Sequence, residues 1–404
     1  MLPIRKKTPS LEPPERLKKL PPYLFVEVDR RKRELVAKGK DVIDLGVGDP
    51  DLPTPDVIIE ALAKAARDPR NHRYALDAGL PELRETFAGW FYERFKVKLD
   101  PFEEILPLIG SKEGIAHLPL AVLNPGDVAL VPDPCYPVYK SATHLAGGIP
   151  HLLPLLESQD FLPDLSTVEP GILDKTRLLF LNYPNNPTSA CATREFFERA
   201  VTFTQGHGIL IAQDAAYSEV TFDGYVAPSI LEIEGARDVA VEFHSLSKTY
   251  NMTGWRIGFA VGNREAIRLL AKVKTNIDSG IFQAVQLAGK CALERGKKAL
   301  EGSLAIYGKR RDLFVSGLNR LGWKVPVPKG TFYVWIPVPP GYTSQELAMK
   351  LLEDVQIVVT PGNGFGPNGE GYVRASLTIS ETRLQEALKR IERIHSHPHG
   401  WKEA

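Results

Sequence analysis

Short apolar runs separated by longer amphipathic stretches dominate the chain between about residues 55 and 300. The runs do not alternate with polar residues, which is typical of strands that are buried on both faces of a sheet. The stretches between them have the length and spacing of helices. This pattern predicts an α/β fold in which helices cover both faces of one sheet. The expected strands are 128–131, 177–181, 209–212, 239–241 and 257–261.

The pattern changes at both ends of this region. After about residue 300 the chain combines long amphipathic helices with short strands, which predicts a smaller α+β domain. The first 22 residues are rich in proline and charge and predict an extended arm. We therefore expect an arm at 1–22, a large domain at 55–300, and a small domain built from 23–54 and 301–404. The expected elements of the small domain are helices at 23–38, 305–321 and 381–395 and strands at 41–45, 331–336, 355–359 and 372–376.

Composition narrows the classes of function. The 404 residues are enough for two or three domains, and 50 basic against 49 acidic side chains leave a net charge of +1. Because the basic and acidic side chains are nearly equal in number, the net charge indicates no attraction to nucleic acid or to a membrane surface. No apolar stretch approaches the roughly 18 residues of a membrane span, and no apolar run follows the basic N-terminus as in a signal peptide.

The three cysteines, Cys135, Cys191 and Cys291, lie far apart in the sequence. An odd number of scattered cysteines argues against both a disulfide framework and a zinc cluster, and is typical of a reducing compartment. We therefore expect no metal site and, by default, a cytoplasmic protein.

Polar side chains directly follow three of the predicted strands. Asn186 follows the strand at 177–181, Asp214 and Tyr217 follow the strand at 209–212, and Lys248 follows the strand at 239–241. Ligands of open α/β sheets bind beyond the carboxyl ends of the strands, so these side chains are expected to converge. Each alone is weak evidence, because Asn-Pro is a common turn and an aspartate after a strand is more often a helix cap.

Lys248 lies among possible phosphate donors, with Ser245 and Ser247 before it and Arg256 after it. A lysine amine forms Schiff bases with carbonyl compounds. Serine hydroxyls and a guanidinium are the donors that a phosphate monoester needs. A lysine that can form an imine beside a phosphate site suggests pyridoxal phosphate as the cofactor. The alternative is a basic surface turn between a strand and a helix.

The other candidate residues meet the chemical needs of this cofactor. Asp214 would pair with the ring nitrogen and keep it protonated, so that the ring accepts electrons. Tyr217 and Asn186 could donate to the ring oxygen and stabilise its anionic form. Ser111, at a glycine-flanked helix start, would hold the phosphate together with backbone amides of that helix. Tyr136 could stack on the ring or be an ordinary aromatic residue of a proline-bounded turn.

Several motifs follow one another in the order of a known family. They are 48–51, 74–84, 186–188, 214–217, 245–256 and Arg374. On these motifs the chain resembles the fold type I aminotransferases of the aspartate aminotransferase class, which depend on pyridoxal phosphate. The resemblance implies a large domain with a mixed, mostly parallel seven-stranded sheet between helices, plus a smaller α+β domain. It also implies a homodimer with shared active sites.

The same resemblance implies a role for each site residue. Lys248 would form the internal aldimine and then move the proton between the substrate Cα and the cofactor. Arg374 would bind the substrate α-carboxylate, helped by Asn186 and the backbone of Gly48. The phosphate contacts would come from Ser111, the Lys112 backbone, Ser245, Ser247, Arg256 and, from the partner subunit, Tyr74.

The choice of substrate is a finer question. Three segments are similar to those of LL-diaminopimelate aminotransferases: 16–25, 44–55 and 244–255. This similarity implies ping-pong transfer from glutamate to tetrahydrodipicolinate, which yields LL-diaminopimelate and 2-oxoglutarate in lysine biosynthesis. Tyr23 and, from the partner subunit, Asn276 would contact the far end of the substrate, although Tyr23 could instead pack the start of its helix. Asp77 stands where some of these enzymes carry a glutamate.

Other functions fit parts of the pattern. An aspartate, alanine or aromatic aminotransferase is the nearest alternative, and a pyridoxal-phosphate β-lyase or racemase can share the fold. A transcription regulator with an aminotransferase-like half needs a DNA-binding domain, which an arm of 22 residues is too short to form. Residues 364–369 satisfy the dinucleotide fingerprint of NAD oxidoreductases, but Pro367 interrupts them and a strand follows, so we interpret them as a loop. Ser189 replaces the glycine of the usual Asn-Pro-Thr-Gly motif and is expected to alter that turn only slightly.

Overall fold

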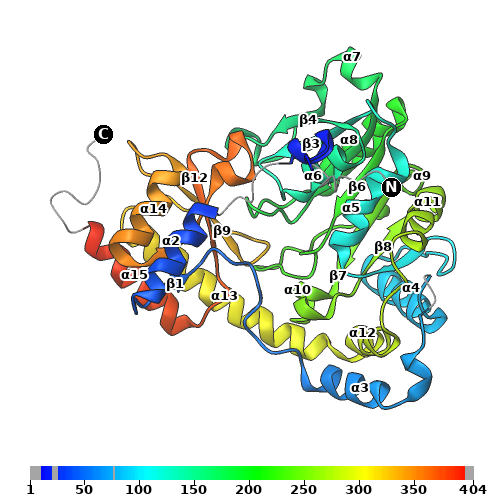
Figure 1. Cartoon of the computed structure of the whole chain (residues 1–404), viewed down its shortest axis with the longest axis horizontal. Helices are drawn as coiled ribbons and strands as arrows, with labels where there is room; N and C mark the ends of the chain where they lie inside the picture. Colours follow the sequence, from blue (N-terminus) through cyan, green and yellow to red (C-terminus); the bar gives the residue numbers. More distant parts are fainter. Residues whose placement is uncertain (1–10, 21–25, 76–77, 396–404) are drawn as a thin grey trace, which may run out of the picture.

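The structure, a computed structural model, describes residues 11–20, 26–75 and 78–395. In Figure 1 the elements form two groups, a large sheet covered by helices and two small sheets packed with helices from both ends of the chain. The prediction of an α/β region joined to a smaller α+β region is confirmed. The residue bounds given above for the domains stay a prediction.

The large sheet has seven strands in the order β2-β8-β7-β6-β5-β3-β4. Strand β8 runs antiparallel to both of its neighbours, and the other pairs are parallel. This is the mixed, mostly parallel seven-stranded sheet that the resemblance implies. The strands are β2 (Ile105–Leu108), β3 (Val128–Asp133), β4 (Ile149–Pro154), β5 (Thr176–Asn182), β6 (Leu210–Asp214), β7 (Ala240–Ser245) and β8 (Gly258–Gly262).

Both faces of this sheet are buried, which explains the continuous apolar runs. On β3, Ala129 and Val131 belong to one buried cluster, whereas Val128 and Leu130 belong to another. Burying each aliphatic or aromatic side chain contributes about 1.5–3 kcal/mol, so both faces favour apolar residues. The first face packs against α5 (Ser111–Val122), α6 (Val138–Leu145) and α11 (Arg264–Thr275), and the second against α3 (Asp56–Ala66), α4 (Pro81–Phe95), α8 (Arg194–His207) and α12 (Gln283–Arg295).

The carboxyl ends of the neighbouring strands β5, β6 and β7 lie side by side. Asn182 on β5 pairs with Asp214 on β6, which in turn pairs with Phe243 on β7. Strands β6 and β7 extend past their predicted ends, to Asp214 and Ser245. The apolar runs end before the strands do, because the backbones of the polar residues that follow still form hydrogen bonds of the sheet. A strand end predicted from the last apolar residue is therefore too early.

The small sheets combine strands from distant parts of the chain. Strands β11, β12 and β9 form an antiparallel sheet, and β1 pairs in parallel with β10. The single strand predicted over 355–359 is wrong, because the chain changes pairing partner from β1 to β12 after Val358. The bounds are β1 (Ile43–Asp44), β9 (Tyr333–Pro337), β10 (Ile357–Val358), β11 (Thr360–Pro361) and β12 (Tyr372–Ser376).

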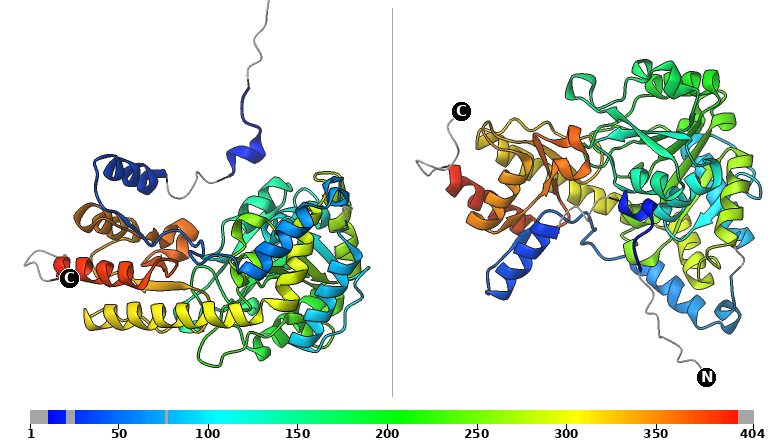
Figure 2. Two further views of the ribbon diagram at one scale, coloured as in Figure 1. Left: turned by 90° about the horizontal axis from the view of Figure 1, so that it is seen from below. Right: turned by 45° about the horizontal axis from the view of Figure 1, so that its top comes forward.

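Four helices accompany the small sheets: α2 (Val26–Ala37), α13 (Lys297–Arg320), α14 (Ser344–Val355) and α15 (Glu381–His395). Figure 2 shows α13, in yellow, running from the helices of the large sheet to the side of α15. The boundary expected at residue 300 therefore falls inside a continuous helix, which begins eight residues before the predicted start of 305.

Short helices complete the chain: α1 (Glu15–Lys18), α7 (Pro170–Leu173), α9 (Ala236–Val239) and α10 (Leu246–Thr249). The part of the expected extended arm that the structure describes contains α1, which buries none of its residues. Within the described ranges, no helix combines the length and the apolarity needed to cross a membrane.

Candidate active site

A cavity of about 710 Å³ lies where the carboxyl ends of the parallel strands face the small sheets. Four cationic side chains line it, whereas Asp214 is the only carboxylate among the described lining residues. This imbalance suits a ligand that carries several negative charges. Most of the predicted site residues line the cavity: Gly48, Ser111, Lys112, Tyr136, Asn186, Asp214, Tyr217, Ser245, Ser247, Lys248, Arg256 and Arg374.

Lys248 projects from α10, which begins directly after β7. The hydroxyl of Ser245 caps this helix by accepting from the Ser247 N–H at 3.2 Å. Lys248 Nζ donates to the carbonyl oxygen of Gly48 at 2.8 Å. Burial lowers the pKa of Lys248 to about 8, with smaller effects from Asp49, which raises it, and from nearby arginines. A larger fraction of this amine is therefore neutral, and nucleophilic, near pH 7 than of an ordinary lysine.

Asp214 ends β6 and is 7% exposed. One carboxylate oxygen accepts from the Tyr139 hydroxyl at 2.8 Å, and the other accepts from the Ala216 N–H at 3.2 Å. Burial raises the pKa of Asp214 to about 6, although both hydrogen bonds and His244 oppose this. A buried carboxylate in this position gains from a cationic partner, such as a protonated ring nitrogen.

The start of α5 and Arg256 form the end of the cavity suited to a phosphate. Gly110 precedes α5 with a φ of 76°, and a β-carbon there would collide with the guanidinium of Arg256. Arg256 itself has a φ of 55°, a conformation that non-glycine residues adopt rarely and mostly at functional sites. Unpaired amides at a helix N-terminus, together with the hydroxyl of Ser111 and this guanidinium, are an anion-binding set.

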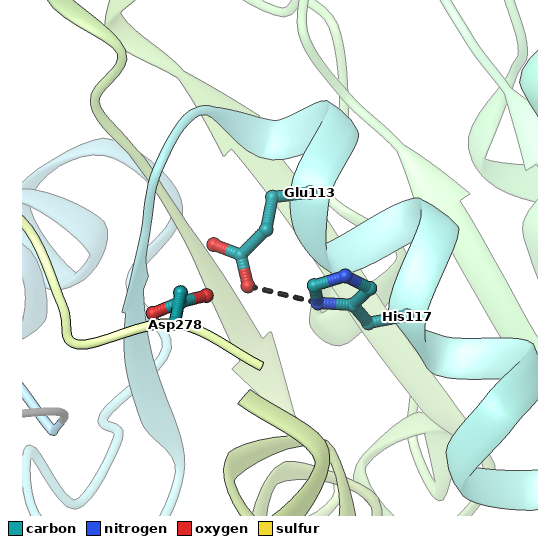
Figure 3. Close-up of side chains that lie close together, drawn as sticks. All are labelled: Glu113, His117 and Asp278. Carbon is teal, nitrogen blue, oxygen red and sulfur yellow. Dashed lines mark hydrogen bonds and ion pairs between the residues drawn. The ribbon is translucent and has the colours of Figure 1, made fainter. Parts of the chain in front are cut away.

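Glu113 supports this helix start. Its carboxylate accepts from the backbone N–H of Ile109 at 2.7 Å and from Lys274 Nζ at 3.2 Å. Figure 3 shows its other oxygen facing the ring of His117, with Asp278 beside them. These are possible metal ligands, but the Lys274 ammonium is 1% exposed, lies 2.6 Å from Asp278, and already offsets the carboxylate charge. We interpret the group as a support for α5.

Arg374 lies on β12 at the opposite side of the cavity. Its Nη1 donates to the Asn186 side-chain oxygen at 2.8 Å and its Nη2 to the Gly46 carbonyl at 2.7 Å. Its Nε is buried and has no hydrogen-bond partner among the described residues. A buried guanidinium in this state is suited to bind an anionic group of a substrate.

Asn186 is oriented by its neighbours. Its N–H donates to the Asn182 side-chain oxygen at 2.8 Å, and Asn182 in turn donates to the Asp214 carbonyl at 2.8 Å. Because an arginine has only donors, the atom of Asn186 that faces Arg374 must be its oxygen. The amide nitrogen of Asn186 is thus turned away from Arg374 and can donate to a ligand.

Ser189 has a backbone conformation that favours glycine, the residue expected here from the Asn-Pro-Thr-Gly motif. Its φ is 62°, a left-handed conformation that glycine adopts without strain. The serine hydroxyl donates to the Tyr333 carbonyl at 2.8 Å and lies 3.0 Å from the Thr331 hydroxyl. The substitution therefore adds contacts to β9, whereas Asn186 keeps its place at the cavity.

Residues 364–369 form a loop of two short 3-10 turns, η6 (Gly362–Phe365) and η7 (Pro367–Gly369), as predicted. The Asp133 carboxylate at the end of β3 accepts from the Asn368 N–H at 3.0 Å and from its side-chain amide at 2.6 Å. The Cys135 N–H donates to the Phe365 carbonyl at 3.0 Å. This docking places the Phe365 ring 4.8 Å from the Arg374 guanidinium.

Two tyrosines of the site lie outside the predicted set. Tyr139 donates to the buried carboxylate of β6, and Tyr333 holds its hydroxyl 2.9 Å from that of Tyr217. Tyr139 follows Tyr136 by three residues, about one helical turn, and this spacing is a signal that could have identified it. Tyr333 lies in a strand of apolar residues, where no spacing distinguishes it from a core aromatic.

Two predicted residues, Tyr74 and Asn276, do not line the cavity of this chain. Tyr74 is 90% exposed. Asn276 is exposed at the end of α11 and donates to the Lys272 carbonyl at 2.8 Å. Tyr23 lies outside the described residues, as does Asp77. The expected roles of Tyr74 and Asn276 in a partner subunit stay predictions.

Comparison with known proteins supplies the family context. A family model described as aminotransferase class I and II matches residues 40–391. An LL-diaminopimelate aminotransferase of Syntrophobacter fumaroxidans is 53% identical over 94% of this chain and 98% of its own length. One of Maridesulfovibrio salexigens is 54% identical over 96% of this chain and 100% of its own. The structure of apo-BacF from Bacillus subtilis superposes with a TM-score of 0.92 at 39% identity, covering 96% of this chain and 99% of that one.

Proposed function

The chain belongs to the class I and II aminotransferases, and we propose that it transfers the amino group of glutamate to tetrahydrodipicolinate. The products would be LL-diaminopimelate and 2-oxoglutarate, formed in two successive half-reactions of a ping-pong sequence in lysine biosynthesis. The observation that carries this choice is identity of 53% and 54%, over nearly the whole length, to two curated LL-diaminopimelate aminotransferases.

Pyridoxal phosphate is the cofactor of this family, and the lining of the cavity fits it. The start of α5 with Ser245, Ser247 and Arg256 would hold the phosphate. Asp214 would hold the proton on the ring nitrogen, and its burial at the floor of the cavity supports this role. Tyr136 would stack on the ring. When bound, the cofactor supplies an aldehyde that condenses with amines and a ring that accepts electrons.

Lys248 is the residue that we expect to attach the cofactor and to move the proton. Its Nζ already hydrogen-bonds inside the cavity, and its lowered pKa of about 8 leaves more of the amine unprotonated near pH 7. A base whose pKa lies near the working pH is the most effective in proton transfer. Lys248 Nζ would take the proton from the substrate Cα and carry it across the site.

Arg374 would bind the α-carboxylate of each substrate as a bidentate pair. Its unpartnered buried Nε and its contact with Asn186 support this role. Asn186 and the backbone of Gly48 would complete the contact. The amide nitrogen of Asn186 and the hydroxyl of Tyr217 would donate to the cofactor ring oxygen.

A homodimer with shared sites is part of the proposal. Tyr74 of the partner subunit would reach the phosphate, and its 90% exposure in a single chain supports such a role. Asn276 of the partner subunit and Tyr23 would contact the amino-acid head at the far end of the substrate. The cytoplasmic location expected from the scattered cysteines also stays a prediction.

Two half-reactions test the proposal. Glutamate added to the purified holoenzyme should change its visible absorbance and release one equivalent of 2-oxoglutarate per site. Adding tetrahydrodipicolinate to the converted enzyme should then restore the spectrum and form LL-diaminopimelate.

The outcome that contradicts the proposal is a converted enzyme that ignores tetrahydrodipicolinate but reacts rapidly with oxaloacetate or pyruvate. That result would favour the nearest alternative, an aspartate, alanine or aromatic aminotransferase. Release of ammonia and pyruvate from cysteine or cystathionine would instead favour a β-lyase.

A further inference from the structure

The hydroxyls of Tyr217 and Tyr333 form a buried pair in the cavity, and the roles assigned above use only the first. Their oxygens are 2.9 Å apart, and the side chains are 5% and 3% exposed. Tyr333 is held on its main-chain side, since Ser189 donates to its carbonyl at 2.8 Å and its N–H donates to the Thr331 hydroxyl at 3.0 Å. The pair is therefore fixed in place before any ligand binds.

The proton between the two oxygens can belong to either hydroxyl. If Tyr217 donated to Tyr333, it would have no proton left to donate to the cofactor. An anionic ring oxygen is a stronger acceptor than a neutral hydroxyl, because charge-assisted hydrogen bonds are about twice as strong as neutral ones. With an anionic oxygen beside it, Tyr217 therefore donates to that oxygen and accepts from Tyr333.

Two further observations agree with this direction. Burial raises the pKa of Tyr217 well above its usual range, so that it stays protonated and acts as a donor. No other side chain among the described residues hydrogen-bonds to the hydroxyl of Tyr217, so Tyr333 is the donor available to it.

We propose that Tyr333 is a positioning residue of the cofactor site, whose hydroxyl donates to Tyr217 and thereby commits the Tyr217 proton to the cofactor ring oxygen. The inference rests on the proposed function, since that ring oxygen belongs to pyridoxal phosphate. Hydrogen bonds in a chain polarise one another, so each strengthens the next. Tyr333 thus acts on the cofactor through Tyr217.

The ring of Tyr333 contacts a different part of the cavity from its hydroxyl. It faces the Arg374 guanidinium, whose central carbon lies 4.2 Å from the ring centroid. A β-carbon on Gly48 would collide with the Tyr333 hydroxyl, so the glycine leaves room for it. The hydroxyl and the ring can therefore be separated by substitution, because Tyr333→Phe removes only the hydroxyl.

The experiment is a pH titration of the visible absorbance of the holoenzyme without substrate. This absorbance reports the pKa of the nitrogen that joins the cofactor to Lys248. A weaker bond to the ring oxygen makes that nitrogen easier to protonate, so Y333F should raise its pKa by about 0.2–0.6 units. Y217F should raise it further, and in the Y217F background Y333F should add nothing.

Tyr307→Phe is the matched control. Its hydroxyl is buried with no hydrogen-bond partner among the described residues, and its ring lies 5.5 Å from that of Phe332, next to Tyr333. Y307F should leave the titration unchanged. Y333L is a second test that does not depend on one variant folding well: it should show the same rise as Y333F, and a higher KM for glutamate because the ring beside Arg374 is lost.

An unchanged titration in Y333F, or a rise that persists in full in the Y217F background, would overturn the inference. Neither result bears on the substrate, because no amino acid is present. A failure of the proposed function shows itself differently, as a wild-type protein whose absorbance does not respond to glutamate or whose converted form ignores tetrahydrodipicolinate.

Discussion

The two sides of the cavity are built in different ways. The cofactor side consists of strand ends and one helix start within 111–256, brought together by a single sheet. The substrate side consists of Gly48, Phe365, Arg374 and the ring of Tyr333, which come from both ends of the chain and meet through the small sheets. The first side is a product of parallel strand order, whereas the second depends on how separate elements pack.

The charges on the two sides are held differently as well. Asp214 on the cofactor side accepts from two hydrogen-bond donors and forms no ion pair within the described part of the chain. Arg374 on the substrate side has a buried Nε with no hydrogen-bond partner in the described ranges of the chain. Each side thus has one buried charged group that a ligand of opposite charge would pair. Burying such a group without its partner lowers the stability of the protein. The following variants test whether the two sides act separately.

Lys248→Ala should have the largest effect. It removes the amine that attaches the cofactor and moves the proton, so transamination of glutamate should fall by about 10⁴-fold or more. Lys112→Ala is the control, because we expect Lys112 to contribute through its backbone amide and the loss to stay below about tenfold. Steady-state kcat distinguishes the two. Comparable losses in both variants would contradict the assignment of Lys248.

Arg374→Leu should affect the substrate side alone. Losing a charge-assisted bidentate contact costs several kcal/mol, so kcat/KM for glutamate should fall by about 10²–10³-fold. The affinity for pyridoxal phosphate should stay close to that of the wild type, as measured by titrating the apoprotein. Loss of cofactor binding in this variant would show that the two sides are not independent.

Asp214→Asn should reduce activity yet stabilise the apoprotein. The folded-state pKa of about 6 lies above the ordinary 3.8, so the folded protein holds this proton longer than the unfolded chain. Wild-type stability therefore falls as pH rises through this window, and the penalty is complete at pH 7. D214N should raise the apoprotein's free energy of unfolding at pH 7 by about 1–3 kcal/mol.

The check is urea unfolding of both apoproteins at two pH values. The difference should shrink as the pH falls below about 6 and disappear below about pH 3, where the wild-type carboxyl is protonated in both states. A D214N apoprotein that is less stable at pH 7 would show that the carboxylate already has sufficient partners without the cofactor.

Ser189→Gly should have the smallest effect. Glycine relieves the left-handed φ of 62° but removes the hydrogen bond to the Tyr333 carbonyl, and the two changes nearly cancel. We expect the unfolding free energy to change by less than about 1 kcal/mol. Ser189→Ala, which loses the hydrogen bond and keeps the strain, should be the less stable of the two in thermal unfolding. The reverse order would show that the left-handed conformation of residue 189 carries little strain.

The sequence predicts the middle of the large sheet better than its edges. Five of its strands are expected from apolar runs, whereas β2 and β4, at the two edges, are not. Both contain proline, which reads as a strand breaker but is tolerated at a sheet edge where one side of the ladder is unpaired. Edge position is a property of the sheet, and no local pattern reports it.

The site shows the same limit. Lys248, Asp214 and Asn186 follow apolar strands, and parallel pairing places them together, so their convergence can be read from order alone. Tyr333 looks like a core residue until β9 is packed beside Tyr217 and Arg374. Tyr139 lies about one helical turn after Tyr136, but only its hydrogen bond to the carboxylate of Asp214 shows that it belongs to the site.

The amino-acid sequence by itself determined the large α/β sheet, the chemistry of the lysine, aspartate and arginine, and the family, because these depend on local periodicity and on residue types in order. Only the tertiary structure decided which oxygen faces which donor, that the Nε of Arg374 has no hydrogen-bond partner among the described residues, and that the hydroxyls of two tyrosines lie 2.9 Å apart. Such relations depend on distances between segments far apart in the chain. Burial, which shifts the pKa values of Lys248 and Asp214, likewise exists only once those segments pack.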